Sequence, residues 1–351
     1  MTLAGKSPAL AVSLCLCGFV LLGCGESPRS SNDGPVILSG STMGTYYRVT
    51  LAAIPTTLGE GELQASIDTR LGKINTGMST YLSDSEVSRF NRYTGKDWFP
   101  VSADTATVVA EALQIFRQSE GAFDITVGPL VDLWGFGPPE GTRSIPSPES
   151  IENTLKKVGS QHLHVRLSPP AIKKSETSDV QIDLSGIAKG FAVDSVADSL
   201  EEFGVTDYLV DIGGEMLARG RKKDGSSWTI AIESPIVNER SIHKTIAVSD
   251  QAIATSGDYR NYFESDGKRY SHEIDPRTGR SIQHRLVSVT VLAPSCMLAD
   301  AWATALIVLG PKRGLQSAEG ENLAAFFIIK GDEGFLEKKS SAFDRLSADN
   351  Q

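Results

Sequence analysis

The longest regular apolar pattern in the chain lies between residues 63 and 78. Leu63, Ile67, Leu71, Ile74 and Met78 follow one another at intervals of four, four, three and four residues. Side chains at these intervals share one face of an α-helix, because the helix repeats about every 3.6 residues. The pattern predicts an amphipathic helix whose apolar stripe packs on a sheet.

Two capping patterns predict the starts of further helices. Residues 83–86 read Ser-Asp-Ser-Glu, a capping-box pattern that predicts a short helix ending at Phe90. Ser102 predicts the start of a second helix, which runs through Phe116 and ends at the capping residue Gly121.

The rest of the chain alternates between strand-like and helix-like segments without an internal repeat. Residues 135–150 are rich in proline, glycine and serine, which predicts a surface loop leading to a helix at Pro148. The polar residues 339–351 predict a loose tail. Predicted strands cover residues 180–184, 208–212, 228–232, 244–248, 287–292 and 323–329, and predicted helices cover residues 187–203 and 297–309. This order favours an α+β fold with a mixed, largely antiparallel sheet and packed helices.

The first residues have the pattern of an export signal. Lys6 precedes an apolar run of about 14 residues, short of the roughly 20 that a helix needs to cross a bilayer. The run ends in Leu-Leu-Gly-Cys, which predicts that signal peptide 1–23 is removed and that Cys24 is lipidated. Residues 24–35 would then be a flexible, lipid-anchored tether. The alternative is a signal peptide that merely contains cysteines.

Charge and cysteine content narrow the class of protein. With 34 basic and 43 acidic residues the net charge is −9, and no basic cluster stands out, so a general nucleic-acid binder is excluded. Cys15 and Cys17 lie in the signal and Cys24 is the lipid site, which leaves Cys296 without a partner for a disulfide. Stability must come from an apolar core, built in one large domain or two lobes.

The predicted helix at residues 297–309 is apolar nearly all round but carries Asp300 and Thr304 four residues apart. Their oxygens point to the same side, and a buried carboxylate needs compensation that no Lys or Arg of this helix supplies. A hard cation such as Mg²⁺ would provide it. The alternative is that Asp300 stabilises the helix amino terminus and Thr304 bonds back to a carbonyl.

Eight short motifs follow one another in an order that resembles the ApbE family. They are TMGT (42–45), MSTY (78–81), GAFDIT with GPL (121–130), DLSGIAKG (183–190), VDIGGE (210–215), ATSGDY (254–259), DPRTG (275–279) and ADAWATA (299–305). Each motif alone is weak, but the ordered set is specific. The resemblance implies a T-fold-like flavin transferase domain at residues 36–338.

The family resemblance also implies an activity: transfer of FMN from the substrate FAD to a threonine hydroxyl of an exported redox protein or subunit, with Mg²⁺ as cofactor and AMP released. Two alternatives remain, an FAD pyrophosphatase that yields FMN and AMP, and a flavin-binding lipoprotein without turnover. The expected location is the periplasmic face of a membrane, the inner membrane in the first instance, reached through the lipid anchor.

The resemblance assigns flavin and nucleotide contacts to Met43, Tyr81, Ala122, Phe123 and Asp124. An aromatic ring and a thioether suit a flat, polarizable ring system. Ordinary core packing is the alternative for Met43 and Tyr81.

The resemblance places Asp183 and Lys189 on FAD, and it places the Gly186 carbonyl, Asp300 and Thr304 around the metal. Small residues in a strand–turn–helix allow a close backbone approach to phosphate. Read without the family, the same turn is a plain strand–helix connection. Ser185 stands where the family often has a glycine, which matters little for a carbonyl ligand.

By the same resemblance His272 is the candidate catalytic base, since a neutral imidazole takes up a proton near neutral pH. Glu273 replaces an apolar residue usual in the family; it either raises the basicity of His272 or faces solvent. The other histidines lie outside the motifs and are expected to be solvated or structural: His162, His164, His243 and His284.

Overall fold

The structure, a computed structural model, describes residues 34–137, 143–236, 241–259 and 261–349. The predicted signal peptide 1–23, the lipidation site Cys24 and all but the last two residues of the predicted tether lie outside these residues. No helix in the described part of the chain has the length and apolar character needed to cross a membrane.

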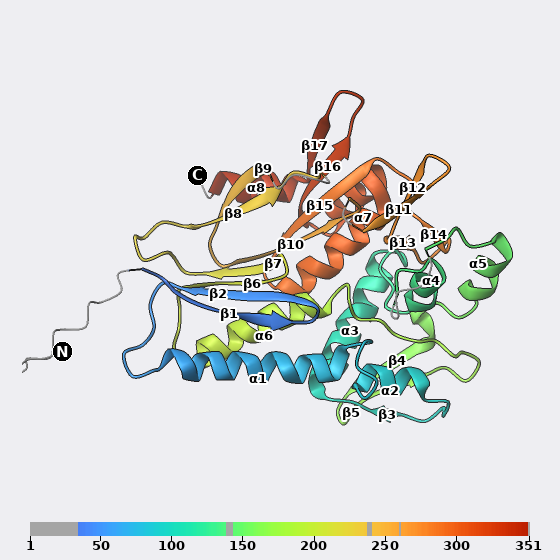
Figure 1. The fold of residues 1–351 in the computed structure, drawn as a ribbon, viewed down its shortest axis with the longest axis horizontal. Helices are drawn as coiled ribbons and strands as arrows, with labels where there is room; N and C mark the ends of the chain where they lie inside the picture. The colour runs from blue at the N-terminus through green and yellow to red at the C-terminus, as the bar shows by residue number, and fades with distance from the viewer. Residues whose placement is uncertain (1–33, 138–142, 237–240, 260, 350–351) are drawn as a thin grey trace, which may run out of the picture. The chain divides into compact units, whose positions relative to one another are not determined.

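The described residues form helices and strands throughout (Figure 1). The helices are α1 (Glu60–Met78), α2 (Glu86–Arg92), α3 (Ala103–Gln118), α4 (Gly128–Leu133), α5 (Pro148–Leu155), α6 (Ala188–Glu202), α7 (Cys296–Gly320) and α8 (Ser341–Asp349), with a 3-10 turn at Ser160–His162. The strands are β1 (Val36–Thr42), β2 (Thr45–Leu51), β3 (Phe99–Pro100), β4 (Leu163–Leu167), β5 (Pro170–Lys174), β6 (Tyr208–Ile212), β7 (Glu215–Arg219), β8 (Trp228–Glu233), β9 (Ile242–Val248), β10 (Gln251–Gly257), β11 (Tyr262–Ser265), β12 (Lys268–Ser271), β13 (Ile274–Asp275), β14 (Arg280–Ser281), β15 (Leu286–Ala293), β16 (Ala324–Lys330) and β17 (Phe335–Lys339).

An eight-stranded sheet organises the fold, in the order β1-β2-β6-β7-β10-β15-β16-β17. Every neighbouring pair in it is antiparallel. A three-stranded sheet, β3-β5-β4, and the hairpins β8-β9, β11-β12 and β13-β14 surround it. The predicted α+β class with a largely antiparallel sheet is confirmed.

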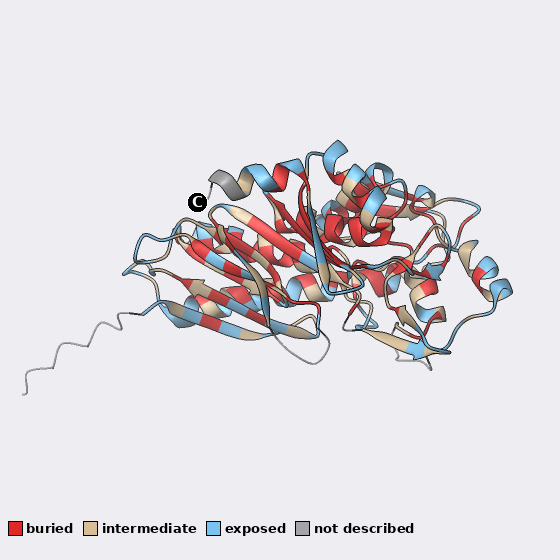
Figure 2. Cartoon of the chain, turned by 90° about the horizontal axis from the view of Figure 1, so that it is seen from above, coloured by how far each residue is buried: buried red, intermediate tan, exposed pale blue. Residues whose placement is uncertain are grey.

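The central strands are buried on both faces. All residues of β15 are buried, although successive side chains of a strand point to opposite sides. An apolar strand of this kind requires a cover on each face of the sheet. Figure 2 shows buried residues concentrated in the central strands and the elements packed on them, with exposed residues outside.

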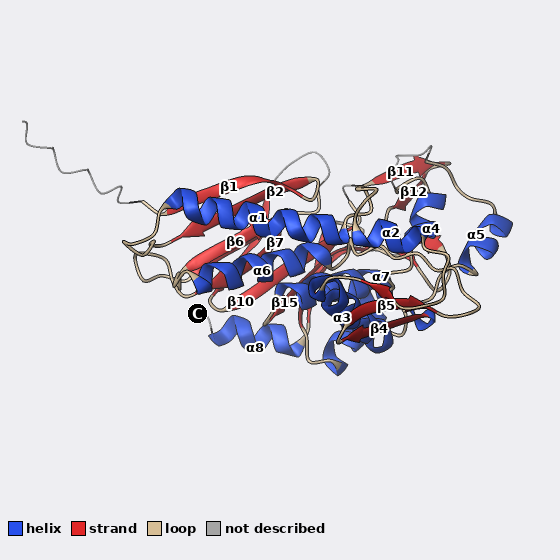
Figure 3. Cartoon of the chain, turned by 90° about the horizontal axis from the view of Figure 1, so that it is seen from below, coloured by secondary structure: helices blue, strands red, loops and turns tan. Residues whose placement is uncertain are grey.

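Helices α1, α6 and α7 cover one face of the sheet (Figure 3). The stripe predicted between residues 63 and 78 is confirmed as the buried face of α1, with no member more than 3% exposed. These side chains join those of α6, α7 and the sheet in the main apolar core.

The opposite face is covered by the β8-β9 hairpin and α8, and a second apolar core lies between them. The prediction of a loose tail at residues 339–351 is therefore wrong. Residues 341–349 form a helix, and Phe343 is 1% exposed and stacks on Phe326 of β16. A few apolar positions among polar ones were enough to dock this segment.

The two predicted capped helices exist, with one correction. α2 begins after Ser85, whose side chain accepts from the Ser88 backbone N–H; Ser83 is not the cap. α3 begins after Ser102 as predicted. At its end the Gly121 N–H donates to the Phe116 carbonyl, a Schellman closure.

The predicted strand at residues 180–184 is wrong. Val180, Ile182 and Leu184 are buried and Gln181 between them is exposed, but the segment pairs with no strand in the described part of the chain. The side-chain amide of Asn91 both donates to and accepts from the Ile182 backbone, at 2.8 Å each. The Asp183 N–H donates to the Ile125 carbonyl at 2.7 Å. The alternation of apolar and polar residues predicts which side chains are buried, but it does not reveal which groups form hydrogen bonds with the backbone.

The other predicted strands and helices are confirmed within two residues at each end, apart from the end of α7. Its regular part ends at Leu309, as predicted, because Gly310 has a non-helical backbone at φ +77° and Pro311 follows. The helical segment beyond, to Gly320, was not predicted. The helix predicted at Pro148 is α5, capped by Ser147.

Candidate active site

A cavity of about 850 Å³ opens beside the amino-terminal half of α7. Its wall combines residues of all eight motifs with residues of β8 and of the β11–β13 region. Among the described residues it includes every predicted site residue except Met43: Tyr81, Ala122, Phe123, Asp124, Asp183, Gly186, Lys189, His272, Asp300 and Thr304. The fold brings together segments that lie far apart in the sequence.

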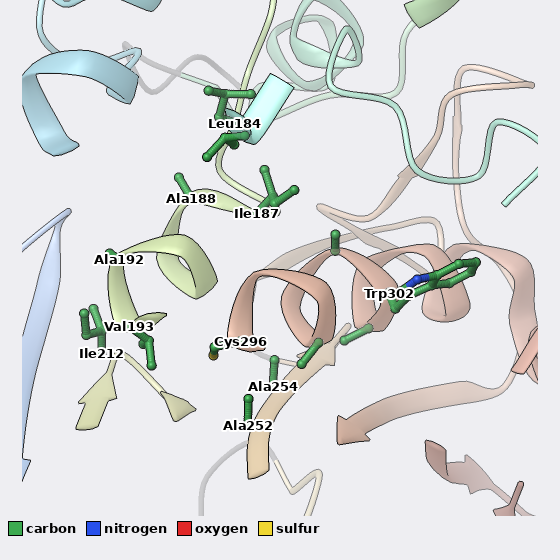
Figure 4. Packing of buried hydrophobic residues seen from close by; sticks show 14 of the residues in the cluster. Leu184, Ile187, Ala188, Ala192, Val193, Ile212, Ala252, Ala254, Cys296 and Trp302 are labelled. Carbon is green, nitrogen blue, oxygen red and sulfur yellow. The ribbon is translucent and has the colours of Figure 1, made fainter. Parts of the chain in front are cut away.

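Close packing of α6 on α7 fixes the position of the cavity floor. A Cβ at Gly190 would overlap the Cys296 carbonyl oxygen and lie 2.8 Å from the Asp300 Cβ, so only glycine fits there. Figure 4 shows the small side chains at this junction, with Ala192 on α6, Ala252 and Ala254 on β10, and Cys296 on α7.

Asp194 of α6 ties the same helices together by hydrogen bonds. Its carboxylate accepts from the backbone N–H groups of Cys296 and Met297, at 2.7 and 2.9 Å. These are the first donors of α7, which have no partner inside the helix. Burial raises the pKa of Asp194 to about 6, although these two N–H groups lower it.

The three predicted metal ligands lie together on the cavity floor. A Cβ at Gly186 would lie 3.4 Å from Thr304 Oγ1. Asp300 is 4% exposed, and one of its oxygens accepts from the Gly190 N–H at 3.0 Å. Asp300 and Thr304 occupy one face of α7, as their spacing predicted.

The floor holds more negative than positive charge. Lys189 Nζ lies 2.5 Å from Glu215 Oε1 and 3.9 Å from Asp300 Oδ1, so one cation faces two carboxylates. Burial raises the pKa of Glu215 to about 7 and raises that of Asp300, while Lys189 lowers both. Burial lowers the pKa of Lys189. The nearby carboxylates of Asp300 and Glu215 raise it by more than burial lowers it, so the net shift is upward.

Glu215 was missed by the sequence analysis. It is 5% exposed, and its Oε2 has no hydrogen-bond donor among the described residues. In the sequence it is the last residue of the VDIGGE motif, directly after Gly213-Gly214, two glycines that both take positive φ. That turn starts β7 with the Glu215 side chain facing the cavity.

The predicted flavin contacts differ in their surroundings. Tyr81 is 75% exposed at the cavity, whereas Phe123 is 3% exposed in its wall. Core packing, the alternative for Tyr81, is therefore wrong. For Met43 it agrees with the structure, where this side chain packs partly buried against the main core and does not line the cavity.

Asp124 lines the cavity, but its carboxylate is occupied by the protein. It accepts from the backbone N–H and hydroxyl of Thr126 and from those of Ser160. Asp183 is similarly held by the N–H and hydroxyl of Ser185, at 2.9 and 2.7 Å. Both carboxylates shape the turns that carry them.

His272 also lines the cavity. Its Nδ1 is 3.2 Å from the Asn261 carbonyl oxygen, and its Nε2 is 3.5 Å from Glu273 Oε1. The Glu273 side chain is only 12% exposed, so the alternative that it faces solvent is wrong. Burial raises the pKa of Glu273, while His272 lowers it.

The remaining histidines lie away from the cavity wall. His164 contacts Ser175, His243 contacts Glu337, and His284 is packed against Gly310. In the described residues no group of three or more His, Cys, Asp or Glu side chains has the arrangement of a metal site. The set on the floor differs in kind, since it combines one carboxylate with a hydroxyl and a carbonyl.

The sequence matches one family model and is similar to proteins that all carry the same name. The model of the ApbE family matches residues 43–327. An FAD:protein FMN transferase from Vibrio cholerae is 47% identical over 324 residues, which cover 92% of this chain and 95% of that protein. One from Haemophilus influenzae is 44% identical over 322 residues, which cover 89% of this chain and 91% of the relative.

Solved structures give the same picture. The flavin transferase ApbE from Vibrio cholerae superposes with a TM-score of 0.82 at 47% identity, covering 89% of this chain and 98% of the other. The apo form of the Pseudomonas stutzeri flavinyl transferase ApbE also gives 0.82, at 41% identity, covering 89% and 96%.

Proposed function

The chain belongs to the ApbE family, and from that premise we propose that it is an FAD:protein FMN transferase. It moves FMN from FAD to a threonine hydroxyl of an exported redox protein or subunit and releases AMP, with Mg²⁺ as cofactor. The observation that carries the proposal is the cavity floor, where Gly186, Asp300 and Thr304 converge beside Lys189.

The floor residues fit a divalent cation. Two carboxylates, Glu215 and Asp300, face the single charge of Lys189, and Glu215 Oε2 has no donor among the described residues. Uncompensated negative charge of this kind is costly in a buried site. Mg²⁺ prefers oxygen ligands, and the Asp300 carboxylate, the Thr304 hydroxyl and the Gly186 carbonyl supply them. When bound, the ion would neutralise charge on the FAD pyrophosphate.

The protein's own groups account for the rest of the reaction. The threonine oxygen forms a bond to the FMN phosphorus, the bond from that phosphorus to the AMP oxygen breaks, and the hydroxyl proton passes to a base. His272 suits that role: if its Nδ1–H donates to the Asn261 carbonyl, Nε2 can accept a proton. Lys189 offers positive charge to the pyrophosphate, so catalysis rests on positioning and charge neutralisation.

One experiment separates this function from its two alternatives. The soluble mature chain is incubated with FAD, Mg²⁺ and exported proteins of the source organism, and the products are identified by mass spectrometry. FMN attached to a protein threonine, with AMP released, is the expected result. Free FMN and AMP without any protein adduct would identify an FAD pyrophosphatase, and intact FAD would identify a flavin carrier.

The proposed location follows from the leader pattern. A lipid on Cys24 would hold the enzyme at the periplasmic face of a membrane, the inner membrane in the first instance. Exported acceptor proteins would meet it there.

A further inference from the structure

Lys189 faces two carboxylates at unequal distances. Its Nζ is 2.5 Å from Glu215 Oε1 but 3.9 Å from Asp300 Oδ1. The first distance is that of a direct, charge-assisted hydrogen bond, whereas the second is too long for one. Asp300 Oδ2 already accepts from the Gly190 N–H at 3.0 Å, so Oδ1 is the oxygen left for a cation. The ammonium group therefore stops about 1 Å short of the oxygen on which the proposed metal site depends.

The backbone brings Lys189 within reach of Asp300. Lys189 and Gly190 are consecutive residues in the first turn of α6, and the Gly190 N–H holds the Asp300 carboxylate. A Cβ at Gly190 would lie 2.8 Å from the Asp300 Cβ, so the two helices are in direct contact here. Lysine has a long, flexible side chain with three donors. Its ammonium group can therefore pair with Asp300 Oδ1 unless another group holds it.

Glu215 is that group, and the turn before β7 fixes its position. Gly213 and Gly214 both take positive φ, and the Gly214 N–H donates to Asp211 Oδ1 at 2.9 Å. A Cβ at Gly213 would lie 2.8 Å from Thr45 Cγ2, so the turn packs tightly on the start of β2. The Glu215 side chain therefore starts from a rigid backbone.

The Glu215 carboxylate depends on Lys189 in return. Among the described residues Lys189 is the one side chain that pairs with it, and its Oε2 is buried without a donor. The Glu215 side chain is 6% exposed, whereas the Lys189 side chain is 29% exposed. A buried carboxylate is stable only with a partner of opposite charge. The ion pair holds the ammonium group at Glu215 and leaves Asp300 Oδ1 unpaired.

We propose that Glu215 is a positioning residue that keeps the Lys189 ammonium group off Asp300 and so keeps the metal site open. Without the Glu215 charge, Asp300 is the remaining carboxylate beside the ammonium group, and Lys189 pairs with Oδ1 as an internal cation. The three side chains then carry no excess negative charge to attract a divalent ion. The inference rests on the metal site of the proposed function.

Metal binding in the absence of flavin tests the proposal. Mn²⁺, which also takes oxygen ligands, is added to the soluble mature chain, and the free ion is measured by electron paramagnetic resonance. Glu215→Gln keeps the size of the side chain and should raise the Kd for Mn²⁺ about ten- to a hundredfold, the usual cost of losing a group that supports a metal ligand. Adding Lys189→Met should lower the Kd again, because the internal cation is gone. Thermal melts check that each variant is folded.

Glu273→Gln is the matched control. Glu273 lines the same cavity, and the ring that its carboxylate faces at 3.5 Å is His272. After burial and His272, the next influences on the pKa of Glu273 are Lys189, which lowers it, and Asp300, which raises it. The control therefore measures the loss of a nearby negative charge that does not hold the lysine, and it should raise the Kd for Mn²⁺ far less. Equal losses for Glu215→Gln and Glu273→Gln, or no recovery with Lys189→Met, would overturn the proposal.

A crystal structure of metal-free Glu215→Gln gives an independent readout. Lys189 Nζ should move from 3.9 Å to about 2.8 Å from Asp300 Oδ1, a shift that a purely structural role of Glu215 does not predict. An ammonium group that stays away from Asp300 would contradict the proposal.

The parent protein separates this inference from the proposed function. If the parent binds no Mn²⁺, the metal site itself is wrong and the inference falls with it. If the parent binds Mn²⁺ and Glu215→Gln binds it equally well, the metal site stands and only the role of Glu215 is wrong.

Discussion

Asp300 and Thr304 are the residues on which the proposed metal site depends. Asp300→Asn keeps the shape of the side chain and an acceptor for the Gly190 N–H, but removes the charge. Thr304→Val removes only the hydroxyl. Both proteins should fold, and each should lose about a hundredfold or more in transferase rate, since charge neutralisation contributes several kcal/mol to such reactions. Excess Mg²⁺ should rescue Thr304→Val better than Asp300→Asn.

A thermal melt beside an Mg²⁺ titration of activity checks this prediction. Thr255→Val is the matched control, because Thr255 lines the same cavity but bonds Thr290, and it should lose far less activity. A folded Asp300→Asn enzyme with full activity and unchanged Mg²⁺ dependence would rule out the site. The alternative role of Asp300, stabilising the helix end, predicts that outcome with a loss of about 1 kcal/mol in stability.

At the scale of residues, a functional role could be predicted for polar residues that stand in an otherwise apolar segment. Asp300 and Thr304 stand out in an apolar helix, so their placement on one buried face could be predicted. The role of Glu215 could not be predicted, because it depends on an ion pair with Lys189, which lies in a distant segment. Lys189 showed the same limit: its own helix predicted contact with phosphate, but not the ion pair with Glu215.

At the scale of elements, the junction of α6 and α7 positions the whole cavity floor. Gly190→Ala places a Cβ against the Cys296 carbonyl, so the helices must separate at a cost of about 1–3 kcal/mol in the free energy of unfolding. Urea denaturation measures the loss. The control is Gly72→Ala on α1, where nothing lies within 4 Å of the new Cβ, and a gain of about 0.5–1 kcal/mol is expected. Equal effects at both positions would show that the junction is not tight.

Asp194, which caps α7, should make stability depend on pH. Its folded-state pKa of about 6 lies above the value of about 3.9 for an unfolded chain. The stability it contributes is therefore complete below about pH 4 and is lost as the pH rises through 6. Asp194→Asn cannot titrate, so relative to the parent its free energy of unfolding should rise by about 2–3 kcal/mol from pH 4 to pH 7.5.

Urea denaturation across that pH range measures the effect. Asp344→Asn, on the exposed side of α8, controls for the loss of one negative charge. Parallel stability curves for the parent and Asp194→Asn would contradict the assignment.

Helices and strands could be predicted where the spacing of apolar residues in the sequence corresponds to the face that is buried in the structure. The α1 stripe is such a case. Residues 180–184 were predicted as a strand because their apolar and polar residues alternate, but their backbone is bonded by the Asn91 side chain, which the pattern does not reveal. α8 was missed because Phe343 finds its partners on β16, and a short polar segment carries no trace of them.

At the scale of the whole molecule, the proposed anchor can be tested independently of the chemistry. Cys24→Ser should block lipidation, so the protein should shift from the membrane to the soluble fraction or accumulate with its signal attached. Cys15→Ser, inside the predicted signal, should change neither processing nor location. Cell fractionation with labelled palmitate gives the readout. An acyl-labelled, membrane-bound Cys24→Ser protein would refute the assignment.

The order of strands in the sheet also governs how the chain can fold. β1 and β2 form a local hairpin, but the outer edge of β2 pairs with β6, where Leu51 faces Tyr208. An isolated hairpin is marginal in water, so it gains support only after the intervening helices have been synthesised. Contacts between such distant segments slow folding. Until β6 arrives, the edge of β2 is open to other chains, and aggregation at that stage competes with folding.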